Sequence, residues 1–360
     1  MTEPLVSQTA AAFTVAGTAR PELAQDLVRV EVEETTAGLK TLIARFLAFG
    51  PLPGGSDGVL YLDGRVFDFG REITLALGPD ATARTVFKGH ISALEVDFDE
   101  GAVPQAVVFA EDRLMDLRMT RRMKTYERMS DADIATEIAG RQGLTPDIDA
   151  DGPTYDVVQQ WNVSDLAFLR ERARLLRAEV WVDGDTLGFK TRDRRTATGP
   201  TLVQGDHILR LRARADLAHQ RTSVRVSGYD AAERAAIDEE AGADVVKAEV
   251  ESGRTGPEIL QSAFGERVSY RTCEAPLTTG EAADWARAEM LRRSRSFVQV
   301  AATTRGVAEL VVGSRLTLQR VGVPFEGGGY CTTRVLHTWD QEQGFRTAFD
   351  AERPTLEEGA

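Results

Sequence analysis

Short segments in which apolar and polar residues alternate fill the first third of the chain. They are LVRVEVEET (27–35), GVLYLDGRVFDFG (58–70), REITLALG (71–78), TVFKGHISALEVDF (85–98) and PQAVVFA (104–110), separated by Gly, Pro or Asp. A period of two places successive side chains on opposite faces of a sheet, so these segments predict antiparallel strands. The segment LKTLIARFL (39–47) is compatible with either a strand or a helix.

The middle third changes to helical spacing. Ser130 and Asp133 form an N-cap pair ahead of IATEIAGRQG, whose apolar residues recur three or four positions apart. Ser164 is the predicted N-cap of a second helix, which carries an apolar stripe made of Leu166, Leu169, Ala173 and Leu176. EVWVDGDTLGFK (179–190) then predicts a hairpin with its turn at Asp183 and Gly184.

A polar cluster, QQWN (159–162), stands directly before the second helix. Its amides are interpreted as residues of a turn and of the helix start, because Asn and Ser side chains bind free backbone groups there. Trp161 is expected to pack against the helix as a hydrophobic staple, and ligand stacking is the alternative.

Strand-like segments return in the last third. They are HILRLRAR (207–214), RTSVRVSGYD (221–230), ELVVGSRLTLQRV (309–321), YCTTRVLHTWD (330–340) and FRTAFDAERP (345–354), with one helix predicted behind a capping box of Thr278 and Glu281. The order of strand, His-containing strand, acidic turn and returning strand near residues 71–113 recurs near residues 314–353. This echo predicts two copies of one β-fold with a helical insert between them.

Composition excludes several classes of protein. With 42% hydrophobic and 28% charged residues, the 360-residue chain is predicted to be globular, and no window is apolar enough for stable membrane insertion. A net charge of −13 argues against nucleic-acid binding. The first twenty residues do not resemble a signal peptide, so synthesis in the cytoplasm is expected. The two cysteines, Cys273 and Cys331, are expected to be structural thiols. The four histidines are scattered along the chain, so neither a metal site nor a cofactor is expected.

No catalytic motif is present. GxGxxG, GxxxxGK[ST], HExxH and GxSxG are all missing from the sequence. The carboxylates of EVDFDEG, which are Asp97, Asp99 and Glu100, are expected to cover an exposed turn, and His90 and His337 are expected to be structural. The run Gly327–Gly329 is interpreted as a hairpin tip, since no helix follows it to hold a phosphate. We therefore expect no enzyme activity.

Two segments of the middle third carry a resemblance to a known family. KTYERMSDADIATEIAGRQGL (124–144) and VVQQWNVSDLAFLRERARLLRAEVWVDGDTLGF (157–189) resemble the late control protein D and VgrG-like hub proteins of contractile phage tails and injection systems. The motif residues are Tyr126, Ser130, Asp131, Asp133, Ile134, Gln160, Asn162, Ser164, Asp165, Phe168 and Leu169. The segment from Gly306 to Pro354 resembles the end of the family's hub region, whereas Arg128 and Arg177 stand where glycine is usual.

The resemblance implies a fold and a set of partners. It implies a mainly β, α+β chain, with a tube-protein-like β-barrel or sandwich domain at 1–115, a helix-containing domain at 116–200 and a second tube-like domain with one helix at 201–360. It further implies a structural baseplate hub, a homotrimer that joins sixfold inner tube proteins to a threefold spike made by another polypeptide, beside other baseplate proteins, in a phage tail, a secretion system or a free injection particle. Echoed positions make Ile73, Leu75, Leu77, Leu316 and Leu318 candidate oligomer-interface residues.

Two other functions stay open at this point. A tail-associated cell-wall hydrolase would use Asp97 or Glu100 as its carboxylates. A carbohydrate- or effector-binding module would expose Trp161 and Trp181 for stacking.

Overall fold

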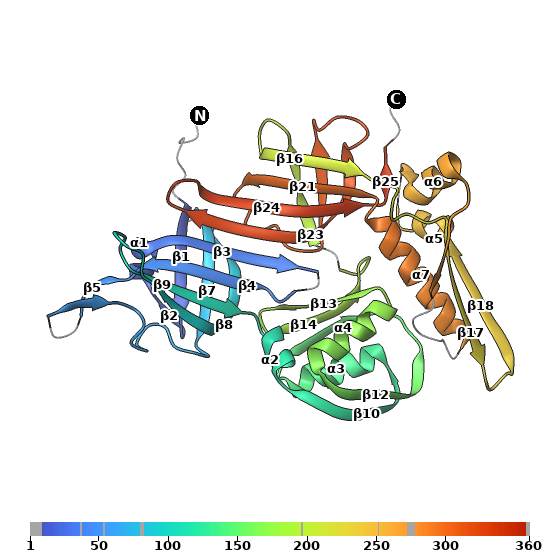
Figure 1. The fold of residues 1–360 in the computed structure, drawn as a ribbon, viewed down its shortest axis with the longest axis horizontal. Coiled ribbons are helices and arrows are strands. Elements are labelled where there is room, and N and C mark those ends of the chain that lie inside the picture. The colour runs from blue at the N-terminus through green and yellow to red at the C-terminus, as the bar shows by residue number, and fades with distance from the viewer. Residues whose placement is uncertain are drawn as a thin grey trace.

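A computed structural model describes residues 9–36, 38–52, 55–79, 83–195, 197–250, 252–271 and 278–357. Two β-rich lobes lie end to end, a middle domain with helices packs below them, and a helical insertion lies at the far end of the C-terminal lobe (Figure 1). Cys273 is outside the described residues. No described helix is long and apolar enough to cross a membrane.

The N-terminal lobe consists of the strands that the alternation predicts. Its elements are β1 (Thr9–Val15), β2 (Thr18–Ala19), α1 (Pro21–Asp26), β3 (Leu27–Thr35), β4 (Thr41–Leu47), β5 (Phe49–Pro51), β6 (Asp57–Val59), β7 (Glu72–Pro79), β8 (Arg84–Asp97) and β9 (Gln105–Glu111). The ambiguous segment 39–47 is therefore a strand. The strand predicted at 58–70 is mostly wrong, because the Arg71 guanidinium binds the carbonyls of Gly64, Arg65 and Val66 and folds this segment into a loop.

The C-terminal lobe carries a long insertion between two of its strands. The lobe consists of β15 (Ala197–Val203), β16 (Ile208–Ala215), β21 (Val298–Arg305), β22 (Ser314–Gln319), β23 (Gly327–Asp340) and β24 (Gly344–Arg353). The insertion consists of β17 (Ser223–Asp230), β18 (Ala235–Gly242), α5 (Ala243–Lys247), β19 (Arg254–Thr255), α6 (Gly256–Phe264), β20 (Val268–Arg271) and α7 (Thr279–Arg295), and β19 pairs with β25 (Thr355–Leu356). The Thr278 and Glu281 capping box of α7 is confirmed. The described part of this region holds three helices where one was expected.

One sheet of 13 strands, counted over the described residues, runs through both lobes. The lobes join where β3 pairs antiparallel with β23, so β domains that are far apart in sequence share one hydrogen-bonded surface. Each lobe keeps its own core: Phe13, Phe46 and Leu75 pack in the first, and Val300, Tyr330 and Phe349 pack in the second.

The two lobes have the same strand order. When the six main strands of each lobe are numbered along the chain, their order across the sheet is 1-4-5-6-3-2 in both lobes. In the first lobe this order is β1-β7-β8-β9-β4-β3, and in the second it is β15-β22-β23-β24-β21-β16. A bulge lies at Ser92 of β8 and at Thr333 of β23, the same strand of the two copies. The direction of the first strand differs between the lobes, because β1 is antiparallel to β7 whereas β15 is parallel to β22. The sequence echo thus falls on equivalent strands.

The middle domain contains both predicted helices. Its elements are α2 (Leu114–Met119), β10 (Arg121–Ser130), α3 (Asp131–Arg141), β11 (Thr145–Asp149), β12 (Thr154–Ser164), α4 (Asp165–Leu175), β13 (Ala178–Asp183) and β14 (Thr186–Thr191). The capping box of Ser130 and Asp133, the N-cap Ser164 and the β13–β14 hairpin are confirmed. Arg128 and Arg177, which replace the usual glycine, have φ of 50° and 57°. These left-handed conformations are a physical reason for glycine at both positions.

The interpretation of QQWN is wrong. These residues belong to strand β12, whose period of two turns Gln160 into the core and Trp161 out to solvent, at 0% and 66% exposure. Trp161 pairs across the sheet with Met123 of β10 and is no staple for α4.

Candidate functional site

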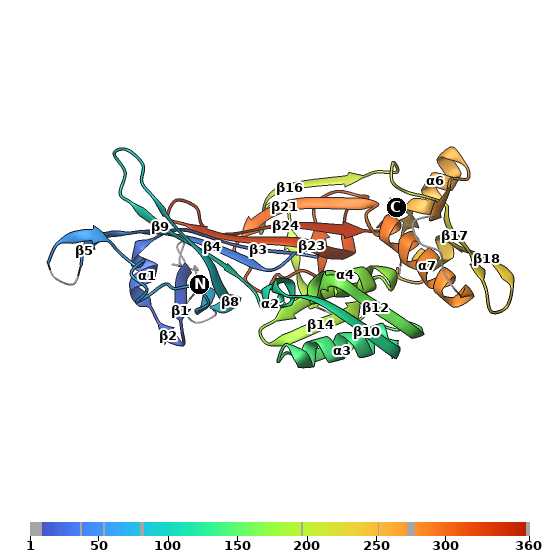
Figure 2. The ribbon, with the colours of Figure 1, turned by 60° about the horizontal axis from the view of Figure 1, so that its bottom comes forward.

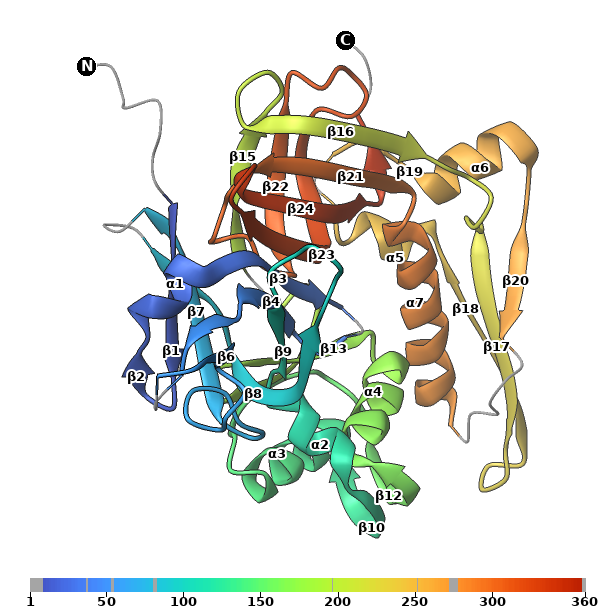
Figure 3. The same ribbon diagram turned by 60° about the vertical axis from the view of Figure 1, so that its left-hand side comes forward.

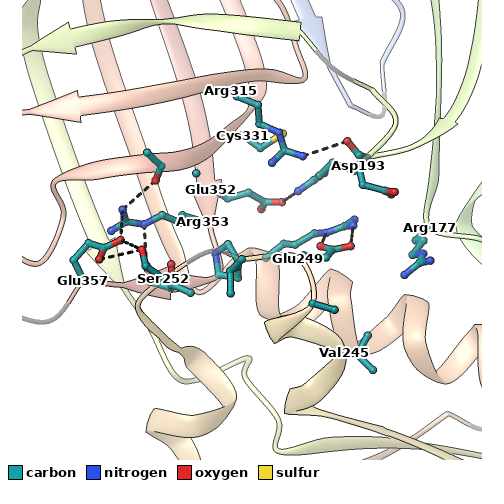
Figure 4. Close-up of a pocket in the computed structure, with 18 of the residues that line it drawn as sticks. Arg177, Asp193, Val245, Glu249, Ser252, Arg315, Cys331, Glu352, Arg353 and Glu357 are labelled. Atoms are coloured by element: carbon teal, nitrogen blue, oxygen red, sulfur yellow. Dashed lines mark hydrogen bonds and ion pairs between the residues drawn. The ribbon is translucent and has the colours of Figure 1, made fainter.

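Two of the pockets in the described residues have arginine-rich walls. The cavity drawn in Figure 4 has a volume of about 600 Å³ and lies between β22–β24, the residues that follow β14, and helices α5 and α7. Arg192 bridges Glu179 (3.0 Å) and Glu352, and Arg295 binds Glu249 through two bonds of 2.9 and 2.7 Å. These charges neutralise each other across the wall, which suits a brace between domains.

The electrostatics of this cavity agree with a brace. Burial opposes ionisation of Glu179, but Arg192 and Arg195 outweigh it and lower the pKa of that carboxyl. Burial raises the pKa of the Cys331 thiol, so the sulfur stays protonated and is a poor nucleophile. Among the described residues no group of three or more His, Cys, Asp and Glu side chains could hold a metal ion.

The family-like residues of the middle domain form a buried polar network. The Asp165 carboxylate is completely buried and accepts hydrogen bonds from Gln160 (2.9 Å), Gln142 (3.0 Å), Arg122 (3.1 Å) and Arg141 (3.3 Å). Tyr126 donates to the amide oxygen of Gln160 at 3.2 Å. Because the partners come from β10, the C-terminal end of α3 and β12, whereas Asp165 begins α4, this network fixes how these four elements pack together.

The other candidates for chemistry lie where the sequence suggests. Asp99 and Glu100 are exposed at the β8–β9 turn, and Asp97 is half-buried with Arg45 at 3.6 Å. His337 is buried between the Thr347 hydroxyl (3.0 Å) and the Leu310 carbonyl (3.1 Å), and burial lowers its pKa to about 4. The carbonyls of Glu326 and Gly328 turn toward the Arg353 guanidinium, so this glycine-rich loop binds a cation of the chain itself.

The five candidate interface residues are core residues. The exposed fractions of Ile73, Leu75, Leu77, Leu316 and Leu318 are at most 1%. Strand β7 pairs with β1 and β8, and β22 pairs with β15 and β23, so neither strand is a sheet edge. The structure therefore corrects this expectation: the echoed strands place these side chains on the inner face of each lobe, away from a partner.

Edges that could contact another chain lie elsewhere. Strand β16 forms the outer edge of the C-terminal lobe and pairs along its length only with β21 (Figure 3). The second half of β8, from Ala93 to Asp97, pairs only with β9, and its hairpin projects away from the sheet (Figure 2). Both edges expose apolar side chains, with Leu209 of β16 at 42% and Val96 and Phe98 at 40% and 62%. Sequence reasoning missed these edges because their partner strands were not assigned.

The joint between the lobes shows how such an edge is bound. Seven residues of β23, from Arg334 to Asp340, pair with β3 from Thr35 to Arg29. Arg334 binds Glu33 at 2.6 Å, and Arg29 binds Asp340 at 3.1 Å. Antiparallel hydrogen bonds with opposite charges across the strands thus hold the two lobes together.

Solved structures with the same fold include tail proteins. The chain is similar to the prophage MuSo2 43 kDa tail protein from Shewanella oneidensis, with 13% identity, 96% of this chain and 98% of that chain covered, and a TM-score of 0.71. A tail protein from Neisseria meningitidis MC58 gives 12% identity, 96% coverage of both chains and a TM-score of 0.68. The E. coli c3393 protein, described as a type VI secretion component similar to T4 bacteriophage gp27 and gp5, gives 12% identity, 93% and 76% coverage, and a TM-score of 0.53.

These likenesses show that the mainly β fold is that of phage tail proteins, as the sequence predicted. No curated protein matches the sequence. One family matches residues 61–340, most of the chain, and is described as "Alg8 N-terminal domain". The chain therefore belongs to the family of the Alg8 N-terminal domain.

Proposed function

We propose that this chain is the structural hub of the baseplate in a contractile, phage-tail-like injection particle. Three copies form a ring that joins a sixfold inner tube to a threefold spike, and the chain performs no catalytic step. The repeated 1-4-5-6-3-2 strand order of the two lobes carries the proposal. Support also comes from the fold of tail proteins and from one chain of a Francisella PdpA–VgrG complex, of which this chain covers 60% with a TM-score of 0.55.

The repeat offers a way to match the two symmetries. A trimer of chains with two lobes each presents six similar sheets to a tube of six subunits, while the single middle domain of each chain keeps the threefold symmetry for the spike. The joint between β3 and β23 sets the spacing of the two lobes within a copy, since its strand pairing and ion pairs leave no flexible linker there.

The chemistry of the interior supports a role that carries load. Arg192 and Arg295 of the cavity in Figure 4 and the buried Asp165 carboxylate are bound by partners within the chain, and Asp99 and Glu100 of the β8–β9 turn are exposed to solvent. A glycoside hydrolase needs two carboxyl groups facing each other across a bound sugar. A brace and an open edge suit a hub better than a hydrolase.

The mass of the assembled protein tests the proposal. Light scattering after size-exclusion chromatography, and native mass spectrometry, should give three times the 39.3 kDa of one chain. Addition of the spike protein and the inner tube protein encoded in the same gene cluster should give larger particles with three copies of this chain. A chain that stays monomeric and binds neither protein contradicts the proposed function.

A further inference from the structure

The repeat of the two lobes points to a partner for two open edges, those of β16 and β8. Strands β3 and β16 are the second strands of their lobes, and β8 and β23 are the fifth strands. Within the chain, β3 of the first lobe binds β23 of the second. The corresponding pair, β16 and β8, consists of two strands that each have an open edge. This inference rests on the proposed trimer, because β8 and β16 can meet only between copies.

The equivalence holds at the level of single residues. In each second strand a bulge follows the first pair, at Val28 in β3 and at Leu209 in β16. In the fifth strands the bulge lies at Ser92 of β8 and at Thr333 of β23. The residues after each bulge form the second half of the strand, which extends past the fourth strand of its lobe. In β23 this half binds β3, and in β8 the same half is open.

The register of the internal joint can therefore be transferred to the open edges. Glu33 opposes Leu336 in the joint, and the equivalent residues are Arg214 and Glu95. Continuing along the strands, Arg212 comes opposite Asp97 and Arg210 comes opposite Asp99. On the other face Ala213 comes opposite Val96, and Leu211 comes opposite Phe98. Three arginines thus meet three carboxylates in one register, with apolar pairs between them.

The charges on these edges are available for such pairing. Arg210, Arg212 and Arg214 are exposed, and so are Glu95 and Asp99. Within the described part of the chain Arg214 has an ion pair with Asp216 and Asp97 has one with Arg45. Charged residues on a sheet edge commonly prevent unwanted pairing, but here the two edges carry opposite signs at matching positions. Opposite charges directly across an antiparallel pair are stabilising.

We propose that β16 of one copy pairs antiparallel with residues 93–99 of the next copy, and that this contact closes the trimer. The interface is head-to-tail, because each copy offers a basic edge on one lobe and an acidic edge on the other. It covers the exposed side chains of Val96 and Phe98 and continues the sheet from copy to copy. Each lobe then joins its neighbour in the same way, alternately within a chain and between chains.

Charge reversal tests the pairing. The triple variants R210E/R212E/R214E and E95R/D97R/D99R should each raise the dissociation constant of the trimer about tenfold or more, because like charges then oppose each other at three positions. All six substitutions in one chain restore opposite charges and should restore the trimer. Reversal of Glu233 and Arg234, at the exposed tip of the β17–β18 hairpin, should leave the mass unchanged. Sedimentation equilibrium measures each mass, and circular dichroism verifies folding.

Cysteine cross-linking gives an independent measure of the register. Chains with Val96→Cys and Ala213→Cys should form disulfide-linked dimers and trimers on mild oxidation, whereas Val96→Cys with Leu209→Cys should not. A wild-type monomer would contradict both the proposed function and this pairing. A wild-type trimer that survives both charge reversals, or that cross-links through the shifted pair as well as through the transferred one, would overturn the pairing alone.

Discussion

The two lobes share a strand order but close the end of their sixth strand with opposite chemistry. At the end of β24 the buried Arg353 guanidinium donates to the carbonyls of Thr355 (2.9 Å), Glu326 (2.9 Å), Pro324 (3.0 Å) and Gly328 (3.2 Å). After β9 the buried Asp112 carboxylate accepts from the backbone N–H groups of Lys40 (2.9 Å) and Leu114 (3.0 Å). One loop presents free carbonyls and the other presents free N–H groups.

This difference teaches which features of the repeat are constrained. The backbone N–H and C=O groups of the sheet and its loops need hydrogen-bond partners. A cationic side chain can bind a loop that presents carbonyls, and an anionic side chain can bind a loop that presents N–H groups. The insertion follows the same rule. β3 ends at Thr35 and β4 begins at Thr41, whereas between β16 and β21 the chain adds a folded unit at the lobe's end. Strand order persists, while loops and side chains diverge.

The largest effect is expected at the arginine of the second lobe. Arg353→Met should lower the free energy of unfolding by about 3–5 kcal/mol, because four backbone carbonyls lose their buried donor at once. Arg346→Met on the same strand is the control, since Arg346 makes one exposed bond, to the Gln343 carbonyl. Urea unfolding measures both. Equal losses in the two variants would show that the carbonyl cluster does not depend on Arg353.

A somewhat smaller effect is expected in how the free energy of unfolding of each lobe depends on pH. Burial lowers the His337 pKa from 6.5 to about 4, so the unfolded chain takes up this proton first, and the stability given by the neutral ring is lost as pH falls from about 6.5 to about 4. Burial raises the Asp112 pKa from 3.8 to about 6, so its contribution is present at low pH and is lost as pH rises through 6. Each amounts to about 3 kcal/mol.

Two variants separate these opposite contributions. Between pH 7 and pH 4, His337→Gln should lose less stability than wild type, and Asp112→Asn should lose more. Denaturant unfolding at several pH values measures the differences. A change of the same sign in both variants would contradict the assignment of opposite groups to the two lobes.

The smallest effect is expected at the joint between the lobes. Glu33 and Arg334 are partly exposed, so a double-mutant cycle with alanine should give a coupling energy of about 0.2–1 kcal/mol, and added salt should reduce it. The cycle is measured by thermal or urea unfolding. A coupling of several kcal/mol would mean that side chains, and not strand pairing, hold the lobes together.

Features set by neighbouring residues could be predicted from the sequence. The alternation of β3, β7, β8 and β9, the caps at Ser130, Ser164 and Thr278, and the β13–β14 hairpin were all predicted. Helix α6 was missed although Thr255 and Glu258 form a capping box ahead of it, so the signal was present. The echo between the ends indicated the repeat before any pairing was known.

The candidate site depended on distant contacts and was predicted poorly. Ile73 and Leu316 carry the echo because they fill two similar cores, and the same burial removes them from any interface. Gln160 and Trp161 are neighbours in one polar cluster of the sequence. The pairing of β12 with β10 places Gln160 in a buried network and Trp161 in solvent.

The sequence by itself determined the strands, the caps and the repeat, because hydrogen bonds and side-chain periods within a few residues specify them. Only the tertiary structure decided that β3 binds β23, that β7 and β22 lie inside the sheet, and that β16 and the end of β8 have an open side. Pairing strands about 300 residues apart depends on the packing of whole lobes, and no local pattern carries that information.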